Sequence, residues 1–218
     1  MDDNVKKFLK QLVPQGEIEY NELNRALKVE EIEWLQKDIY FLGGVKDGMK
    51  RNWDNDIIHK NYFVVDYDLR ENYKKVTGEL INDEELMKML DHILIVIEGT
   101  EFESWRYLVF SGNWFHFYYT SSDLPLEKLR YKELVEYLYQ KLDKLFADPI
   151  FKVDHSCANI WRILRLPGTT NWKRKVKHGL EPAVCEILLD FDRDFPVAAH
   201  LELFEENPNL YFAPIRKT

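Results

Sequence analysis

One short segment, Tyr62-Phe-Val-Val-Asp-Tyr-Asp-Leu69, constrains the fold more than any other part of the sequence. Its aromatic and β-branched residues form a run of strand length, which predicts a buried β-strand. Because alternate residues of a strand face the same way, Asp66 and Asp68 leave one side of the sheet, and Tyr67 is expected to pack on the other. The chain is therefore expected to build a sheet in which one strand ends in a pair of acids.

The segments around this strand predict further strands and helices in irregular alternation. Two aromatic runs, residues 105–110 and 114–119, flank Ser-Gly-Asn and indicate a hairpin. The apolar runs 93–97 and 186–189 are short enough for strands. Helices are expected at residues 5–13, 30–42, 83–90, 126–146 and 196–205, an extended segment at 149–154, and a strand or short helical turns at 160–166. This order predicts an α/β or α+β fold with a mixed sheet.

Length and composition suit one domain with a small appended unit. The chain has 218 residues, of which 45% are hydrophobic and 31% are charged, a balance typical of globular proteins. Residues 1–60 are expected to form a small N-terminal α/β subdomain and residues 61–218 the main subdomain. No run approaches the roughly 18 apolar residues of a membrane span, and the acidic N-terminus lacks the pattern of a signal peptide. A cytoplasmic location without membrane contact is expected.

Charge and cysteine content bear on the possible partners. The net charge is −8, which by itself argues weakly against a nucleic-acid partner. A stretch without acids nevertheless gathers several bases: Arg162, Arg165, Lys173, Arg174, Lys175, Lys177 and His178. Such a stretch is able to bind phosphates, although a solvated loop is an equally good interpretation. Cys157 and Cys185 are the only cysteines, too few for a four-ligand zinc module.

The acid pair is the first candidate for chemistry. Carboxylates on one face repel one another unless a proton or a cation lies between them. Hard oxygen ligands of this kind suit Mg²⁺ or Mn²⁺, and two such ions are able to clamp a phosphoryl-transfer reaction. Asp154 follows another extended apolar stretch and is a candidate third carboxylate. The alternative is a polar strand end at which the chain returns to solvent.

The hairpin supplies a second candidate, His116, which strand alternation would place on one face with Trp114 and Tyr118. A histidine at a hairpin rim is able to donate to a phosphate oxygen, and the backbone N–H groups of the turn that follows Ser111 can form an anion nest. The alternative is a histidine that is hydrogen-bonded within an aromatic face.

A third candidate is the run Arg-Ile-Leu-Arg-Leu-Pro-Gly-Thr-Thr-Asn-Trp-Lys at residues 162–173. Arginine forks and a lysine charge are the usual means of gripping a triphosphate. Arg162 and Arg165 share a face on a helix but not on a regular strand, so a common ligand requires helical or bulged backbone there. The Pro-Gly turn would bring Lys173 back toward the arginines.

Taken in this order, these segments resemble the archaeo-eukaryotic primase superfamily. The resemblance is carried by Asp66-x-Asp68, the Ser111 to His116 hairpin, Asp154, and the run Arg-x-x-Arg-x-Pro-Gly-Thr-x-Asn-x-Lys. It spans about residues 60–175, and the order and spacing of the motifs are far more specific than any one motif alone. The last motif looks most like the primase-polymerases (PrimPols) of plasmids, phages and CRISPR-associated genes.

The resemblance implies a modified RNA-recognition-like sheet with flanking helices, joined to the N-terminal α/β subdomain. It implies an enzyme, a DNA-directed nucleotidyltransferase that makes and extends primers on single-stranded DNA from (deoxy)nucleoside triphosphates. The residues at the matching positions would hold two Mg²⁺ or Mn²⁺ ions through Asp66, Asp68 and Asp154, and the nucleotide through Ser111, His116, Arg162, Arg165 and Lys173. Template or primer contacts are expected from Trp172, Arg174, Lys175 and Lys177.

Two positions depart from the pattern of the superfamily. Trp114 stands where relatives have a small residue, and Asn113 replaces a position that is often basic. Both bear on nucleotide or primer contacts. Because two cysteines exclude a zinc module, the chain either initiates primers unaided or works with other domains of a longer protein.

Two other functions would use parts of the same pattern. A metal-dependent nuclease would need the acids but no triphosphate grip, so the arginines and Lys173 argue against it. A non-catalytic nucleic-acid-binding module with an RNA-recognition-like sheet would have no use for three acids at the ends of strands.

Overall fold

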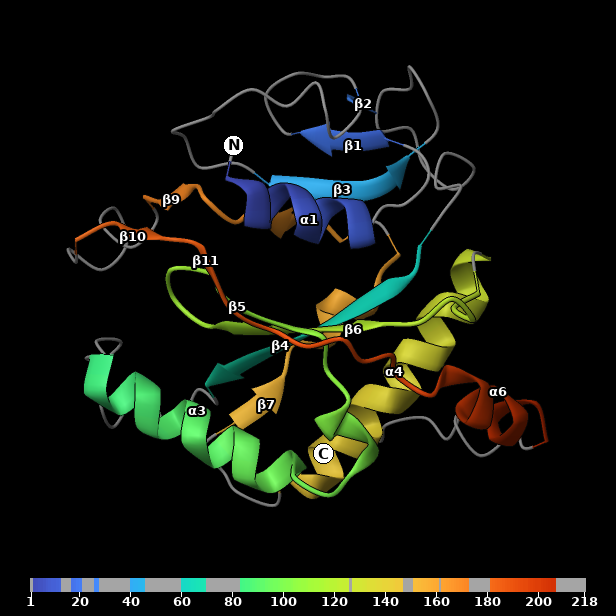
Figure 1. Ribbon diagram of the computed structural model, residues 1–218. Helices are drawn as coiled ribbons and strands as arrows, with labels where there is room; N and C mark the ends of the chain where they lie inside the picture. Colours follow the sequence, from blue (N-terminus) through green and yellow to red (C-terminus); the bar gives the residue numbers. More distant parts are fainter. Residues whose placement is uncertain are drawn as a thin grey trace.

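The computed structural model in Figure 1 describes residues 2–12, 17–20, 26–27, 40–45, 60–69, 83–125, 127–146, 151–160, 162–172 and 181–206. Within these ranges the helices are α1 (Asp3–Leu12), α3 (Asp83–Ile97), α4 (Lys128–Leu145) and α6 (Val197–Glu206), with the 3-10 turns η2 (Glu101–Glu103) and η3 (His155–Ala158). The strands are β1 (Glu17–Tyr20), β2 (Ala26–Leu27), β3 (Tyr40–Val45), β4 (Tyr62–Leu69), β5 (Tyr107–Phe110), β6 (Phe115–Thr120), β7 (Phe151–Val153), β8 (Leu164–Arg165), β9 (Thr170–Asn171), β10 (Ala183–Val184) and β11 (Glu186–Asp190). None of the described helices is both long enough and apolar enough to cross a membrane.

The main sheet has five strands in the order β11-β5-β6-β4-β7. β4, the strand that carries the acid pair, lies between β6 of the hairpin and the short strand β7. The predicted strand and hairpin are confirmed, and so is the α+β class. The sheet was expected to be mixed, but every strand pair in the described residues is antiparallel.

β4 separates two hydrophobic cores because its side chains alternate between the faces of the sheet. Phe63, Val65 and Tyr67 pack in a core shared with α3 and α4, whereas Tyr62 and Val64 pack in a second core shared with α1. Figure 1 shows α3 and α4 on one side of the sheet and α1 on the other. Full burial of one large apolar side chain contributes about 1.5–3 kcal/mol, so packing on both faces holds β4 in place. Tyr67 is buried as predicted.

Helix α4 covers the part of the β4 edge that β7 leaves open. β7 pairs only with the last three residues of β4, beginning at Tyr67. Upstream, the hydroxyls of Tyr131 and Tyr139 donate to the backbone carbonyls of Tyr62, at 3.1 Å, and Val64. Backbone carbonyls on a buried strand edge need such partners. α4 therefore fixes the strand directly upstream of Asp66.

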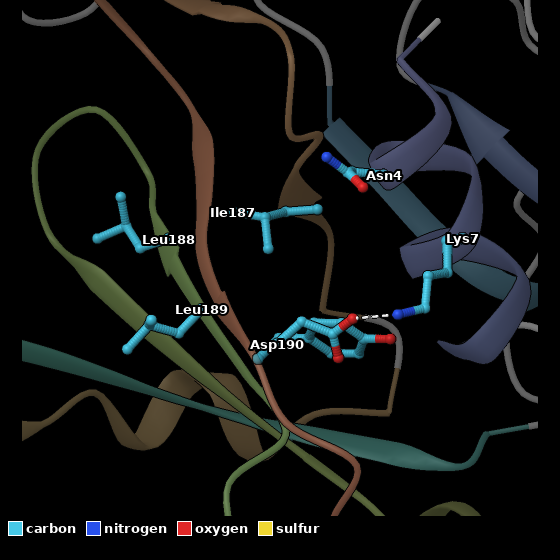
Figure 2. Close-up of a pocket in the computed structure, with 7 residues that line it drawn as sticks. Asn4, Lys7, Ile187, Leu188, Leu189 and Asp190 are labelled. Atoms are coloured by element: carbon cyan, nitrogen blue, oxygen red, sulfur yellow. Dashed lines mark hydrogen bonds and ion pairs between the residues drawn. The ribbon is translucent and has the colours of Figure 1, made fainter.

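Helix α1 is tied to the edge strand β11 as well as to the sheet face. Nζ of Lys7 lies 2.5 Å from Oδ2 of Asp190, across a pocket that Asn4 and Ile187 also line (Figure 2). The ring of Phe8 on α1 also meets that of Tyr107 edge to face, at 4.9 Å between centroids. α1 thus closes one face of the sheet at the end away from β7.

A second sheet, in the order β2-β1-β3-β8, joins distant parts of the chain. Its strand β8 pairs with β3, with Arg165 opposite Tyr40 and Leu164 opposite Phe41. Leu164 also packs in the core between α1 and the main sheet, so β8 connects the two sheets. The division of the chain into residues 1–60 and 61–218 stays a prediction.

One predicted strand is wrong. Residues 93–97 form the last part of α3, which runs without interruption from Asp83 to Ile97. All five residues of this run are apolar, so the run by itself has neither a strand nor a helix periodicity. Together with the preceding residues, however, its buried residues recur every three or four positions, which places one face of a helix in the core. The buried residues of this face are Leu86, Met89, Leu90, Ile93 and Ile97.

The predicted helix at residues 30–42 is also contradicted where it can be compared. Residues 40–42 begin strand β3, and residues 30–39 lie outside the described part of the chain. β3 pairs with β1 on one side and β8 on the other. Hydrogen bonding to two neighbouring strands outweighs a local helical pattern, since propensity is a weak determinant beside tertiary pairing. Helices α1, α4 and α6 and strands β7 and β11 confirm the corresponding predictions.

Candidate active site

Asp66 and Asp154 are brought together by the pairing of β4 with β7. The backbone N–H of Asp154 donates to the carbonyl of Asp66 at 2.8 Å, because Asp154 directly follows β7. On the other edge of β4, Asp66 lies opposite His116 of β6. Three adjacent strands therefore carry two acids and a histidine, far apart in the sequence, to one point of the sheet.

His116 faces Asp66 from a nearly buried position. Its Nε2 lies 3.6 Å from Oδ2 of Asp66, within ion-pair range but too long for a hydrogen bond. The residue is 7% exposed, and its Nδ1 is buried without a hydrogen-bond partner among the described residues. Buried polar nitrogens normally have a partner. A water molecule beside Nδ1, on the side of the ring away from Asp66, would satisfy this nitrogen.

Asp154 caps the 3-10 turn η3 and is surrounded by donors. Its Oδ1 accepts the backbone N–H of Ser156 at 3.0 Å, and its Oδ2 accepts the Ser156 hydroxyl at 2.8 Å. The guanidinium of Arg162 donates to the same Oδ2 at 3.2 Å. Burial alone would raise the pKa of Asp154, but the hydrogen bonds from Ser156 and the charge of Arg162 outweigh it and lower the pKa. Asp154 is thereby held as a carboxylate.

Cys157 is a site residue that no sequence motif indicated. It lies on η3, is 3% exposed, and its Sγ is 3.8 Å from Oδ2 of Asp154. Ligand atoms of Asp66, Asp154 and Cys157 all lie within 4.8 Å of one another, and we call these residues the ligand group. Burial raises the pKa of the Cys157 thiol, and the charge of Asp66 raises it further. The one sequence signal was its place three residues after Asp154, since such pairs align on a 3-10 turn.

The tip of the hairpin contacts strand β9. Oγ of Ser111 donates to the carbonyl of Trp114 at 2.9 Å and accepts its N–H at 3.2 Å, so the hydroxyl is engaged in the turn. The side chain of Asn171 donates to the carbonyl of Ser111 at 3.0 Å. A Cβ at Gly112, whose φ is +87°, would lie 2.6 Å from Cβ of Asn171. Glycine is needed at this contact, and Asn171 is a further residue that the sequence motifs did not single out as structural.

Trp114 does not share a face with His116 as strand alternation predicted. β6 begins only at Phe115, so Trp114 belongs to the turn, where the period of two does not apply. Trp114 packs against the core on the side of α3 and α4. His116 and Tyr118 face the other side, with their ring centroids 6.4 Å apart. The unusual tryptophan is thus directed away from the acids.

The two arginines that were predicted to bind the triphosphate lie in different environments. Arg162 lies outside the regular elements and reaches the carboxylate of Asp154. Arg165 is 4% exposed within β8, and burial lowers the pKa of its guanidinium. The structure brings Arg162 into contact with the acids and places Arg165 at the connection between the two sheets.

Part of the predicted site lies outside the described residues. The backbone of Asp68 pairs with Lys152 in β7, but its side chain is outside the described part. Trp172, at the end of the described segment, is 48% exposed. Four basic candidates are not among the described residues: Lys173, Arg174, Lys175 and Lys177.

Comparisons with known proteins give a structural match. No protein-family model matches the chain, and no curated protein matches it in sequence. The chain is similar to a solved structure, the AEP domain of the primase-polymerase (PrimPol) of cyanophage S-2L, with a TM-score of 0.51 and 14% sequence identity. The match covers 92% of this chain and 97% of that one. The two chains share a fold.

The site on this fold combines groups of opposite charge. The ligand group offers two carboxylate oxygens and a sulfur to a divalent cation. Arg162 and His116 flank the same carboxylates and offer N–H donors to an anion. A cation and a phosphorylated molecule could therefore be held side by side, which is the arrangement that phosphoryl transfer requires.

Proposed function

We propose that the chain is the catalytic core of a DNA primase-polymerase, which makes and extends primers on single-stranded DNA by template-directed nucleotidyl transfer. One observation carries the proposal: β4, β6 and β7 bring Asp66, His116 and Asp154 together, and Arg162 contacts the carboxylate of Asp154. The shared fold with a phage primase-polymerase domain supports it. The motif order supports membership of the archaeo-eukaryotic primase superfamily, among the PrimPols of plasmids, phages and CRISPR-associated genes.

In this proposal Asp66, Asp68 and Asp154 hold two Mg²⁺ or Mn²⁺ ions. Two of these carboxylates fit such a cation, because the ligand atoms of Asp66 and Asp154 lie within 4.8 Å of one another. Bound ions would activate the attacking 3′-hydroxyl and stabilise the leaving pyrophosphate. The protein fixes Asp66 by pairing β4 on both edges and fixes Asp154 by the donors around its carboxylate.

The incoming nucleoside triphosphate would lie on the side of Arg162 and His116. Arg162 would exchange the Asp154 carboxylate for a phosphate, and a ring N–H of His116 would add a second hydrogen-bond donor. The charge of Arg162 offsets part of the repulsion between a triphosphate and the carboxylates, which is large at such short range. The proposed nucleotide-binding set is Ser111, acting through the hairpin turn, His116, Arg162, Arg165 and Lys173.

The single-stranded template and the primer strand would run beside this site. Trp172 offers an exposed ring on which a base can stack, and Arg174, Lys175 and Lys177 follow it in the sequence. We further propose that residues 1–60 form an N-terminal subdomain and residues 61–218 the catalytic subdomain. The enzyme would act in the cytoplasm, alone or with other domains of a longer protein.

One assay separates this function from a nuclease and from a binding module. The purified chain is incubated with single-stranded DNA, labelled nucleotides and Mn²⁺, beside Asp66→Asn and a control, Asp91→Asn, which alters an exposed acid of α3. We expect labelled oligonucleotides from the wild type and the control but not from Asp66→Asn. Shortened template would instead indicate a nuclease. Template binding without products, equal in all three proteins, would indicate a binding module.

A further inference from the structure

The ligand group contains a thiol where a site for Mg²⁺ would need only oxygen. Sγ of Cys157 lies on the same side of η3 as the Asp154 carboxylate, 3.8 Å from its Oδ2. Zinc–sulfur bonds are about 2.3 Å long and zinc–carboxylate bonds about 2.0–2.2 Å, so two ligand atoms of a tetrahedral zinc site lie about 3.4–3.6 Å apart. The ligand atoms of the group lie within 4.8 Å of one another, at most about 1 Å beyond this separation. Small side-chain rotations would therefore close the group on one cation.

His116 gives an independent indication that a ligand belongs at this point. The side chain is 9% exposed, and its Nε2 faces Oδ2 of Asp66 at 3.6 Å, which is too long for a hydrogen bond. This nearly buried nitrogen is thus aimed at the ligand group without a hydrogen bond to it. A water molecule bound to a cation in the ligand group would give Nε2 a hydrogen-bond partner.

We propose that Cys157 is a metal ligand and that the ligand group is a site for thiophilic divalent cations such as Zn²⁺ and Cd²⁺. The inference goes beyond the proposed function and rests on it only in placing a cation at Asp66 and Asp154. Thiolate ligands favour zinc-like ions, whereas Mg²⁺ is bound by oxygen. Cys157 thereby determines which cations the site prefers.

Charge balance supports a thiolate in this group. Binding replaces the proton of the thiol by the cation, and the proton is released to solvent. Two carboxylates, one thiolate and a divalent cation leave one negative charge, which the guanidinium of Arg162, 3.2 Å from Asp154, neutralises. With Mg²⁺ the thiol keeps its proton and stays a weak donor to Asp154. A thiophilic cation would therefore bind to the site more tightly than Mg²⁺ does and would inhibit nucleotidyl transfer.

Cadmium titration tests this inference without relying on activity. A cadmium–thiolate bond has an ultraviolet charge-transfer absorption that carboxylates and imidazoles do not give. CdCl₂ is added to the full chain in its wild-type form and to Cys157→Ser, Cys185→Ser and Asp66→Asn. Cys185 is the matched control, because it is the other cysteine of the chain, is also buried, and lies beside the carbonyl of Arg165 rather than in the ligand group.

We expect the wild type and Cys185→Ser to develop the band with one equivalent of cadmium, and Cys157→Ser to develop none. Asp66→Asn should need at least about tenfold more cadmium, a loss of about 1.4 kcal/mol in binding. The inference is overturned if the wild type gives no band, if Cys157→Ser keeps it, or if Asp66→Asn leaves the cadmium affinity unchanged. Asp66→Asn keeps the test decisive should Cys157→Ser fold poorly.

The same proteins distinguish this inference from the proposed function. Primer synthesis with Mg²⁺ by a wild-type chain that gives no cadmium band would overturn the thiol ligand and leave the polymerase assignment standing. A band that depends on Cys157 and Asp66, in a chain without nucleotidyl transfer, would support the metal site and count against the polymerase.

Discussion

Four donors converge on the carboxylate of Asp154: the N–H and hydroxyl of Ser156, the thiol of Cys157 and the guanidinium of Arg162. Three of them come from η3, the turn that Asp154 caps. Arg162 is different. Its side chain is 39% exposed and does not belong to η3, so it can move to a phosphate while the turn keeps the carboxylate in place.

Replacing Arg162 with methionine tests its part in nucleotide binding. The change keeps the apolar stem and removes the cation. A hydrogen bond to a charged group is worth about 1.5–3 kcal/mol, so we expect the KM for nucleoside triphosphate to rise about 10- to 100-fold, with a smaller effect on the rate at saturation. Primer-extension kinetics measure both quantities. Arg130→Met, at the exposed start of α4, is the control, and an unchanged KM in Arg162→Met would contradict the assignment.

At the scale of elements, helix α4 positions the third acid from outside the sheet. Oδ1 of Asp143 accepts the backbone N–H of Val153 at 3.3 Å, and its Oδ2 lies 2.8 Å from Nε2 of His155. One helical carboxylate therefore holds both neighbours of Asp154. The hydrogen bond to Asp143 and its charge raise the pKa of His155. The same helix caps the β4 edge through Tyr131 and Tyr139, so β4 and β7 are both aligned by α4.

The Asp143–His155 pair makes a pH-dependent contribution to stability. Because the pKa of His155 is raised on folding, the contribution is complete below the ordinary histidine pKa, about 6.5, and is lost as the pH rises through the raised value. The side chains of His155 and Asp143 are 39% and 35% exposed, so solvent screening limits the effect. We expect Asp143→Asn to lower the free energy of unfolding by about 1 kcal/mol at about pH 5.5.

Urea denaturation of the wild type and Asp143→Asn measures this difference. The loss should be smaller at about pH 9, because the contribution falls as the pH rises through the raised pKa of His155. Equal losses at the two pH values would show that the charge of His155 plays no part in holding the turn. Lys88→Met, which removes an exposed ion pair on α3, should show little change at either pH.

At the scale of the whole molecule, burial of one lysine, Lys60, lowers the stability of the folded chain. Lys60 directly precedes β4, is 3% exposed, and places its Nζ 3.9 Å from the centroid of the Tyr62 ring. Burial lowers the pKa of Lys60 to about 7. The unfolded chain therefore binds a proton more readily than the folded one between about pH 7 and pH 10. Folding loses stability as the pH falls through this range, and the penalty is complete below it.

Replacing Lys60 with methionine should remove this penalty and keep a sulfur contact with the Tyr62 ring. We expect the free energy of unfolding at pH 7 to rise by about 2–4 kcal/mol, since each unit of pKa shift corresponds to about 1.4 kcal/mol and the cation–π contact offsets part of the cost. The gain should shrink toward pH 10. Chemical denaturation at both pH values measures it, and the prediction fails if Lys60→Met is less stable than the wild type at pH 7.

The sequence was informative where a short range of residues decides the structure. β4 and the hairpin could be predicted from short apolar and aromatic runs beside turn residues, and α4 from its long helical spacing of apolar residues. Residues 93–97 could not, since an apolar run of five residues suits a buried strand and a buried helix equally. Residues 40–42 became a strand through pairing with β1 and β8, which no local pattern shows.

The same limit applies to the candidate site. Asp66, His116 and Asp154 stood out because their motifs follow one another in a known order. Cys157 and Asp143 did not, because the approach of Cys157 to Asp66 and that of His155 to Asp143 depend on how η3 packs between β4 and α4. The close approach of Gly112 to Asn171 is likewise invisible in a local pattern.

The central claim is that Asp66 belongs to the catalytic centre of a template-dependent nucleotidyltransferase. The release of pyrophosphate from nucleoside triphosphates, with and without single-stranded DNA, tests it most directly. We expect release that requires template and Mg²⁺ or Mn²⁺, and that falls at least about a hundredfold in Asp66→Asn, because even indirect partners of metal ligands are worth 10- to about 100-fold. Asp91→Asn should match the wild type. Release by Asp66→Asn at the wild-type rate, or no template-dependent release by the wild type, would contradict the claim.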